Sequence, residues 1–213
     1  TKDEIKLIKR LPISIFLENI RSVHNVGSIF RSGDGFGVEK IYLTGYTSFP
    51  PRDDLHKTAL GSEEVVPWEH SDDPIAKARD IKSKGISLVL LEQTRNSKSI
   101  YGNEWDFPVC FILGNEVDGV SEELAKEADF HYEIPMRGIK QSLNVSVAAG
   151  IVGILILVLA VTLLLRGRGG GADPSEQAWA AAISPEQQAY EQQLIGMGYT
   201  PEQARAYASQ HFK

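Results

Sequence analysis

The chain has 213 residues, 42% of them hydrophobic, and a net charge of −6. This size fits one domain, or one domain with an appendage. An acidic chain can bind RNA only through a local cationic face. Cys110 is the single cysteine, which excludes an intrachain disulfide and a cysteine-rich metal site. Its apolar neighbours predict a buried strand, and we expect a reducing, cytoplasmic location.

Short apolar runs alternate with helical segments along most of the chain. Strands are predicted at 13–17, 40–45, 65–69, 86–92, 109–113 and 130–134. Helices are predicted after the capping residues Asn25, Asp73 and Ser121. Because the strands are continuous apolar runs, they are typical of a parallel sheet that is covered on both faces. The predicted fold class is therefore α/β, mostly parallel, with helices on both sides.

Three polar loops, at 19–31, 114–121 and 135–144, follow the ends of predicted strands. The carboxyl ends of parallel strands share one edge of a sheet, where ligands bind. The loops carry Asn25 and Arg31, then Asn115 and Glu116, then Ser142 and Asn144. Gly114 and Gly119 permit close backbone approach in the second loop. We expect the three loops to converge on one site.

Each of these residues also has an ordinary structural interpretation. Arg31 alone is typical of a helix surface, Asn25 and Ser142 of helix caps, and Met136 of a core. Only their joint placement favours a site. His24, His56, His70, His131 and His211 show no ligand spacing, so no metal site is expected.

The loops resemble the three motifs of the SpoU/TrmH family of SPOUT RNA methyltransferases. The matching patterns are Asn-x-Arg-x-x-x-Asn-x-Gly-x-x-x-Arg at 19–31, Leu-Gly-Asn-Glu-x-x-Gly at 113–119, and Ile-Pro-Met-x-Gly-x-x-x-Ser-Leu-Asn-Val-Ser-Val-Ala at 134–148. The resemblance implies an α/β fold with a C-terminal trefoil knot, and a homodimer. It also implies methyl transfer from S-adenosyl-L-methionine to a ribose 2′-hydroxyl of tRNA or rRNA.

The resemblance also implies roles for single residues. Arg31 would lie at the ribose, oriented by Asn25, while Ser142 and Asn144 would hold the substrate or the methionine part. Because the pKa of arginine exceeds about 12, we expect Arg31 to position the ribose, and Glu116 is the alternative proton acceptor. The cofactor pocket would be formed by Leu91, Thr94, Leu113, Gly114, Ile134, Met136, Ser142 and Leu143.

Residues 145–165 contain no charged residue, and the middle of this segment is apolar on every side. Such a helix must be covered all round. A second copy of the chain, the C-terminal tail or lipid would each provide a cover, since about 20 apolar residues span a bilayer. We expect the lipid interpretation least, because the same helix begins inside the predicted site.

The predicted organisation is a flexible arm at 1–11, a methyltransferase domain at 12–166, a glycine-rich linker at 167–173 and a helical tail at 174–213. The tail weakly resembles a ubiquitin-associated three-helix module, and we favour the alternative of a helical tail that packs on the apolar helix. A rival function is a non-catalytic RNA- or protein-binding module on the same scaffold, with the tail as its docking element. The abrupt change near Gly153 also permits a spliced or engineered fusion.

Overall fold

The fold is known from a computed structural model of the chain. It describes residues 10–102, 107–140 and 142–166, together with Ser184, Glu186, Gln187, Ala189, Tyr190, Gln193 and Ala208. The predicted linker and nearly all of the predicted arm and tail module lie outside the described residues. The chain divides into one unit of Arg10–Leu157 and a second of Thr1–Lys9 with Val158–Lys213. The domain boundaries taken from the sequence stay a prediction, and the first unit carries the site.

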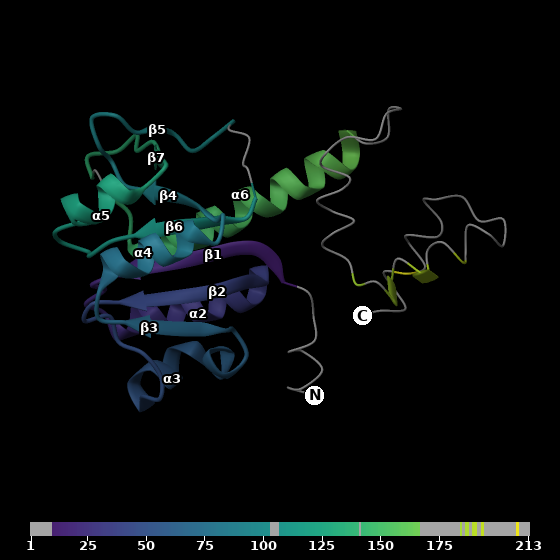
Figure 1. The fold of residues 1–213 in the computed structure, drawn as a ribbon, viewed down its shortest axis with the longest axis horizontal. Helices are drawn as coiled ribbons and strands as arrows, with labels where there is room; N and C mark the ends of the chain where they lie inside the picture. Colours follow the sequence, from purple (N-terminus) through teal and green to yellow (C-terminus); the bar gives the residue numbers. More distant parts are fainter. Residues whose placement is uncertain are drawn as a thin grey trace. The chain divides into compact units, whose positions relative to one another are not determined.

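A seven-stranded sheet forms the centre of the unit Arg10–Leu157, in the order β3-β2-β1-β6-β4-β7-β5 (Figure 1). Every pairing between neighbouring strands is parallel, which confirms the predicted parallel sheet. The strands are β1 (Leu11–Glu18), β2 (Val38–Thr44), β3 (Trp68–Ser71), β4 (Ser87–Leu91), β5 (Lys98–Ser99), β6 (Val109–Leu113) and β7 (Phe130–Glu133). All carboxyl ends therefore lie along one edge, where the predicted loops emerge.

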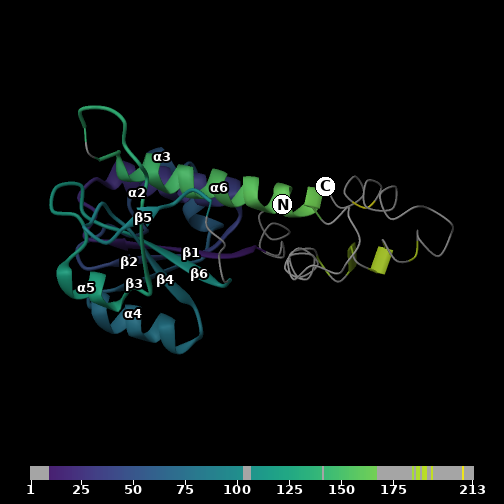
Figure 2. The ribbon, with the colours of Figure 1, turned by 90° about the horizontal axis from the view of Figure 1, so that it is seen from above.

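Helices cover both faces of the sheet, as Figure 2 shows. On one side lie α2 (Val23–Phe36), α3 (Asp53–Ala59) and α6 (Val145–Arg166), and on the other α4 (Pro74–Ser83) and α5 (Glu122–Glu127). A 3-10 turn, η1 (Ser62–Glu64), follows α3. The strands supply both cores because their side chains alternate between faces: Ile15 and Leu17 join the first core, and Phe16 joins the second.

The predicted elements are largely confirmed, with two corrections. Asp73 and Ser121 cap α4 and α5 as expected, but α2 begins three residues early and is capped by the Ser22 hydroxyl, which accepts from the Asn25 N–H. A hydroxyl one turn earlier thus leaves the Asn25 side chain available for other partners. The strand predicted at 65–69 lies at Trp68–Ser71, because Pro67 cannot donate to a ladder.

The apolar helix α6 enters the core only along one side of its first turns. Val145, Ala149 and Val152 are buried, whereas Val147, Ile154 and Leu157 are about half exposed. Gly153 permits a close approach to α2, since a Cβ there would lie 2.2 Å from the Phe36 ring. Within the ranges described above, no helix is long and apolar enough to cross a membrane.

Candidate functional site

A pocket opens at the carboxyl ends of β4, β6 and β7, under the segment that leads into α6. Its lining combines apolar side chains with carboxylates and amides. It is lined by Leu91, Glu92, Gln93, Leu113, Gly114, Asn115, Glu116, Val117, Gly119, Glu133, Ile134, Met136, Ser142, Leu143, Val145 and Ala148. The second and third predicted loops therefore meet here, as expected.

The loop Gly114–Ser121 is held rigidly in a compact form. The Asn115 amide donates to Asn19 O at 2.8 Å, and its oxygen accepts from Val117 N at 2.7 Å. The end of the loop is held by buried Glu18, whose carboxylate accepts from both the N–H and the hydroxyl of Ser121. A Cβ on Gly114 would lie 2.4 Å from the backbone of Gly119, so this position requires glycine. The backbone of Gly114 thus faces the pocket without a side chain in the way.

Glu116 joins this loop to the start of α2. Its carboxylate accepts from the backbone N–H groups of Arg21 at 2.9 Å and Ser22 at 3.2 Å, and from the Asn25 amide at 2.8 Å. Burial acts to raise the pKa of Glu116, but these hydrogen bonds outweigh it and lower the pKa below its usual range. Glu116 is therefore an anionic acceptor whose capacity is largely used by the protein itself.

Asn144 completes the junction from the third loop. Its amide donates to the Asn25 side-chain oxygen at 3.0 Å, and its own oxygen accepts from Ser146 N at 2.8 Å at the first turn of α6. Asn144 thus caps α6 while it contacts α2. Glu116, Asn25 and Asn144 form a continuous hydrogen-bonded chain across the three loops. Its two side-chain hydrogen bonds join residues that are 91 and 119 positions apart in the sequence.

The pKa of a second carboxylate in the pocket, that of Glu92, is shifted in the opposite direction from that of Glu116. Glu92, which directly follows β4, accepts from Val120 N at 3.3 Å. Burial raises the pKa of Glu92, against smaller opposing effects of hydrogen bonds from the backbone of Val120 and Gln93. A partly desolvated carboxylate in a pocket attracts a cationic ligand.

Arg31 does not line this pocket. It is exposed on α2, about 9 Å further along the helix axis than Asn25 because each residue rises about 1.5 Å. It lies in a separate groove, the α2–α3 groove, which is lined by Ser28, Arg31, Ser32, Gly35, Phe36, Lys57 and Thr58. One chain therefore brings Asn25, Glu116 and Asn144 together but does not bring Arg31 to them.

Of the residues predicted for the cofactor pocket, all but Thr94 line it. Thr94 instead forms a local turn, in which its N–H donates to Ser97 Oγ at 3.0 Å. The pocket has further lining residues that the sequence motifs did not indicate: Glu92, Gln93, Val117, Glu133, Val145 and Ala148. Glu92 and Glu133 lie at the ends of predicted strands, so the rule that located the loops applied to them too.

The all-parallel sheet and the pocket at its carboxyl edge define an α/β protein whose pocket combines apolar side chains with the carboxylates of Glu92, Glu116 and Glu133. Sequence comparison then identifies the family. The profile of the SpoU rRNA Methylase family matches residues 12–154, so the chain belongs to that family.

Named relatives agree with this assignment. A tRNA (guanosine(18)-2′-O)-methyltransferase of Aquifex aeolicus is 34% identical over 139 residues, 65% of each chain. A 23S rRNA (guanosine-2′-O-)-methyltransferase RlmB of Neisseria meningitidis is 28% identical over 151 residues, 71% of this chain and 60% of its own length. The chain thus spans less than two thirds of these curated relatives.

Solved structures share the fold. The A. aeolicus TrmH/SpoU tRNA modifying enzyme superposes with a TM-score of 0.68 at 27% identity, over 86% of this chain and 97% of its own. The AdoMet-bound rRNA methyltransferase of Sinorhizobium meliloti gives a TM-score of 0.60 at 25% identity, over 70% and 58%.

Proposed function

We propose that the chain is an S-adenosyl-L-methionine-dependent RNA ribose 2′-O-methyltransferase that acts on tRNA or rRNA. The observation that carries the proposal is the junction of Glu116, Asn25 and Asn144 beside the pocket, formed by the three motif segments. Family membership and the names of the relatives support the reaction, and the AdoMet-bound relative supports the cofactor.

The pocket fits S-adenosyl-L-methionine, which supplies an activated methyl group on a sulfonium. Leu91, Leu113 and Met136 offer an apolar surface for a flat adenine ring, and the backbone at Gly114 offers polar groups at its edge. Glu92 and Glu133 place negative charge near the positive parts of the ligand. The reaction needs no metal in this pocket, because the donor carries its own electrophile.

The geometry favours a positioning role for Glu116 over that of proton acceptor. Three donors already occupy its carboxylate, and its lowered pKa weakens it as a base. Glu116 instead fixes Asn25 relative to Asn144. We therefore assign Arg31 to the ribose or its phosphate, where a guanidinium makes charge-assisted hydrogen bonds.

Arg31 needs a second copy of the chain to reach a bound methyl donor, because within one copy it lies in the α2–α3 groove. We propose a homodimer in which Arg31 of each copy faces the pocket of the other. The half-exposed apolar residues of α6, Val147 and Ile154, offer a surface that such an interface would cover. The trefoil knot is part of the same proposal and is supported by family membership and the shared fold.

Calorimetry with S-adenosyl-L-methionine, followed by transfer of tritiated methyl groups into bulk tRNA and rRNA, tests the proposal. We expect one cofactor per chain and incorporation into one RNA class. Cofactor binding without incorporation into any RNA would contradict it and favour the rival binding module. The tail as docking element and the cytoplasmic location stay predictions from the sequence.

A further inference from the structure

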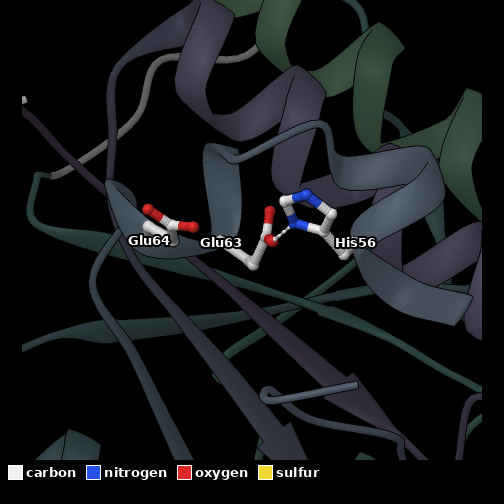
Figure 3. A group of neighbouring side chains, drawn as sticks. All are labelled: His56, Glu63 and Glu64. Atoms are coloured by element: carbon white, nitrogen blue, oxygen red, sulfur yellow. Dashed lines mark hydrogen bonds and ion pairs between the residues drawn. The ribbon is translucent and has the colours of Figure 1, made fainter. Parts of the chain in front are cut away.

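A group of three potential metal ligands lies away from the pocket, where α3 turns into η1. His56, Glu63 and Glu64 each offer one ligand atom, and these atoms all lie within 4.8 Å of one another (Figure 3). In Figure 3 the His56 imidazole faces the Glu63 carboxylate, and Glu64 lies beyond it. The spacing of histidines in the sequence did not indicate this group, because two of its three members are carboxylates.

A tight turn creates the group. Leu60 ends α3 in the left-handed region with φ 54°, which is unusual for a residue with a side chain, and Gly61 follows with φ 90°. The Ser62 hydroxyl donates to Ala59 O at 2.7 Å and closes the turn. The chain thereby reverses, so that Glu63 returns beside His56, one helical turn before the end of α3.

Glu63 is the unusual member, because its side chain is only 7% exposed. One carboxylate oxygen contacts His56 Nδ1. The other, Oε2, is buried and has no hydrogen-bond partner, the single such side-chain atom in the described part of the chain. Buried carboxylate oxygens normally accept a hydrogen bond or coordinate a metal, so this oxygen has room for a donor or a cation.

We propose that His56, Glu63 and Glu64 bind a divalent transition-metal ion, with Zn²⁺ as the representative ion. Imidazole and carboxylate are ligands that such ions prefer. A neutral imidazole with two carboxylates carries a charge of −2, which one divalent ion balances. Ligand atoms around tetrahedral zinc lie about 3.4 Å apart, so side-chain rotations that move the ligand atoms by about 1.4 Å would bring them to this spacing.

The proposed role is structural. The ion would join the last turn of α3 to η1 and hold α3 against α2, where the helices already lie very close: a Cβ on Gly27 would lie 1.9 Å from Thr58 Oγ1. It would also keep the neighbouring Lys57 in the α2–α3 groove opposite Arg31. This site requires no methyl donor, so it stands independently of the proposed reaction.

Calorimetric titration of the full chain with Zn²⁺, after removal of metal with a chelator, tests the proposal. We expect one ion per chain and a rise in Tm on zinc addition. Glu63→Gln, His56→Ala and Glu64→Gln should each weaken zinc binding at least about tenfold. His24→Ala and Glu122→Gln, exposed on α2 and α5, are matched controls and should leave it unchanged.

Two results would overturn the proposal: no zinc-dependent rise in Tm of the unaltered chain, or zinc affinity that is equal in Glu64→Gln and the controls. In that case His56 and Glu63 form only an ion pair. If Glu63→Gln fails to fold, the visible absorption of Co²⁺ in the unaltered chain decides. A tetrahedral spectrum that Glu64→Gln abolishes supports the site, and its absence, or its persistence in Glu64→Gln, contradicts it.

Discussion

The pocket at the carboxyl ends of β4, β6 and β7 and the α2–α3 groove differ in chemistry. The pocket is linked to the start of α2 through the hydrogen bond between Glu116 and Asn25, whereas the groove is lined by residues further along the same helix. The pocket is lined by apolar residues and carboxylates, whereas the groove carries two cations, Arg31 and Lys57. The proposed function assigns the methyl donor to the first and the phosphate backbone of RNA to the second. The two regions are separate within one copy of the chain, and the proposed homodimer would bring them together.

Arg31→Ala should have the largest effect and should distinguish the function of the groove from that of the pocket. Methyl transfer should fall at least about 100-fold, because the acceptor loses its positioning group, while affinity for S-adenosyl-L-methionine stays within a few-fold. Steady-state transfer and calorimetry measure the two effects, with Arg95→Ala as a control of equal charge change. Loss of cofactor binding in Arg31→Ala would show that the groove and the pocket are not separate.

Gly114→Ala tests the pocket, because here affinity for the cofactor should fall. A Cβ 2.4 Å from Gly119 must displace the loop, so affinity for S-adenosyl-L-methionine should fall at least about tenfold, or by about 1.4 kcal/mol. Gly138→Ala is the matched control, since its Cβ would meet no atom within 4 Å.

Mixing Gly114→Ala with Arg31→Ala should restore part of the activity if the site forms between copies. Failure of the mixture to recover activity, despite exchange of subunits, would refute that arrangement.

Glu116→Gln tests the junction between the regions. Replacing a charged acceptor of three hydrogen bonds by an amide should lower kcat/KM about fivefold. Because Glu116 is not expected to be the base, the acidic limb of the pH profile should remain. Loss of the acidic limb in Glu116→Gln would instead show that Glu116 is the proton acceptor.

The stability of the same variant gives a pH test. The folded-state pKa of Glu116 is lowered, so its charge stabilises the fold above the unfolded value of about 4.3 and loses this effect as the pH falls through the folded value. The difference in free energy of unfolding between the unaltered chain and Glu116→Gln should therefore shrink below about pH 4. Denaturant titrations at several pH values measure it.

Glu92→Gln should have the smallest effect. Burial raises the folded-state pKa of Glu92, so its contribution to stability is present below the unfolded pKa and is lost as pH rises through the folded one. At pH 7.5 the amide should raise Tm by a few degrees, yet weaken S-adenosyl-L-methionine binding a few-fold. Tm and affinity that fall together would show that Glu92 is needed for the fold itself.

The sequence predicted the features that depend on local patterns. Apolar runs located the strands, and short polar side chains located the caps of α4 and α5. It placed Asn25, Glu116 and Asn144 in one site because parallel strands end at one edge. It did not predict which atoms meet. Asn25 was assigned to capping, but Ser22 takes that role, and so Asn25 bridges Glu116 to Asn144.

Two features had no signal in the sequence. The helical rise separates Arg31 from Asn25, but the location of Arg31 in the α2–α3 groove follows from the packing of α2 against α3, which no local pattern predicts. The approach of His56 to Glu63 follows from the left-handed conformation of Leu60, which the presence of a leucine in the sequence does not predict. Tertiary contacts determine both features.

The most direct test of the central claim is to locate the transferred methyl group. The chain should be incubated with bulk tRNA and rRNA and with S-adenosyl-L-methionine that carries a deuterated methyl, and the RNA digested to nucleosides for mass spectrometry. The account predicts the label on the ribose 2′-oxygen of one nucleoside, and none with Arg31→Ala. Label on a base, or no label in any RNA although the chain binds the cofactor, would contradict it.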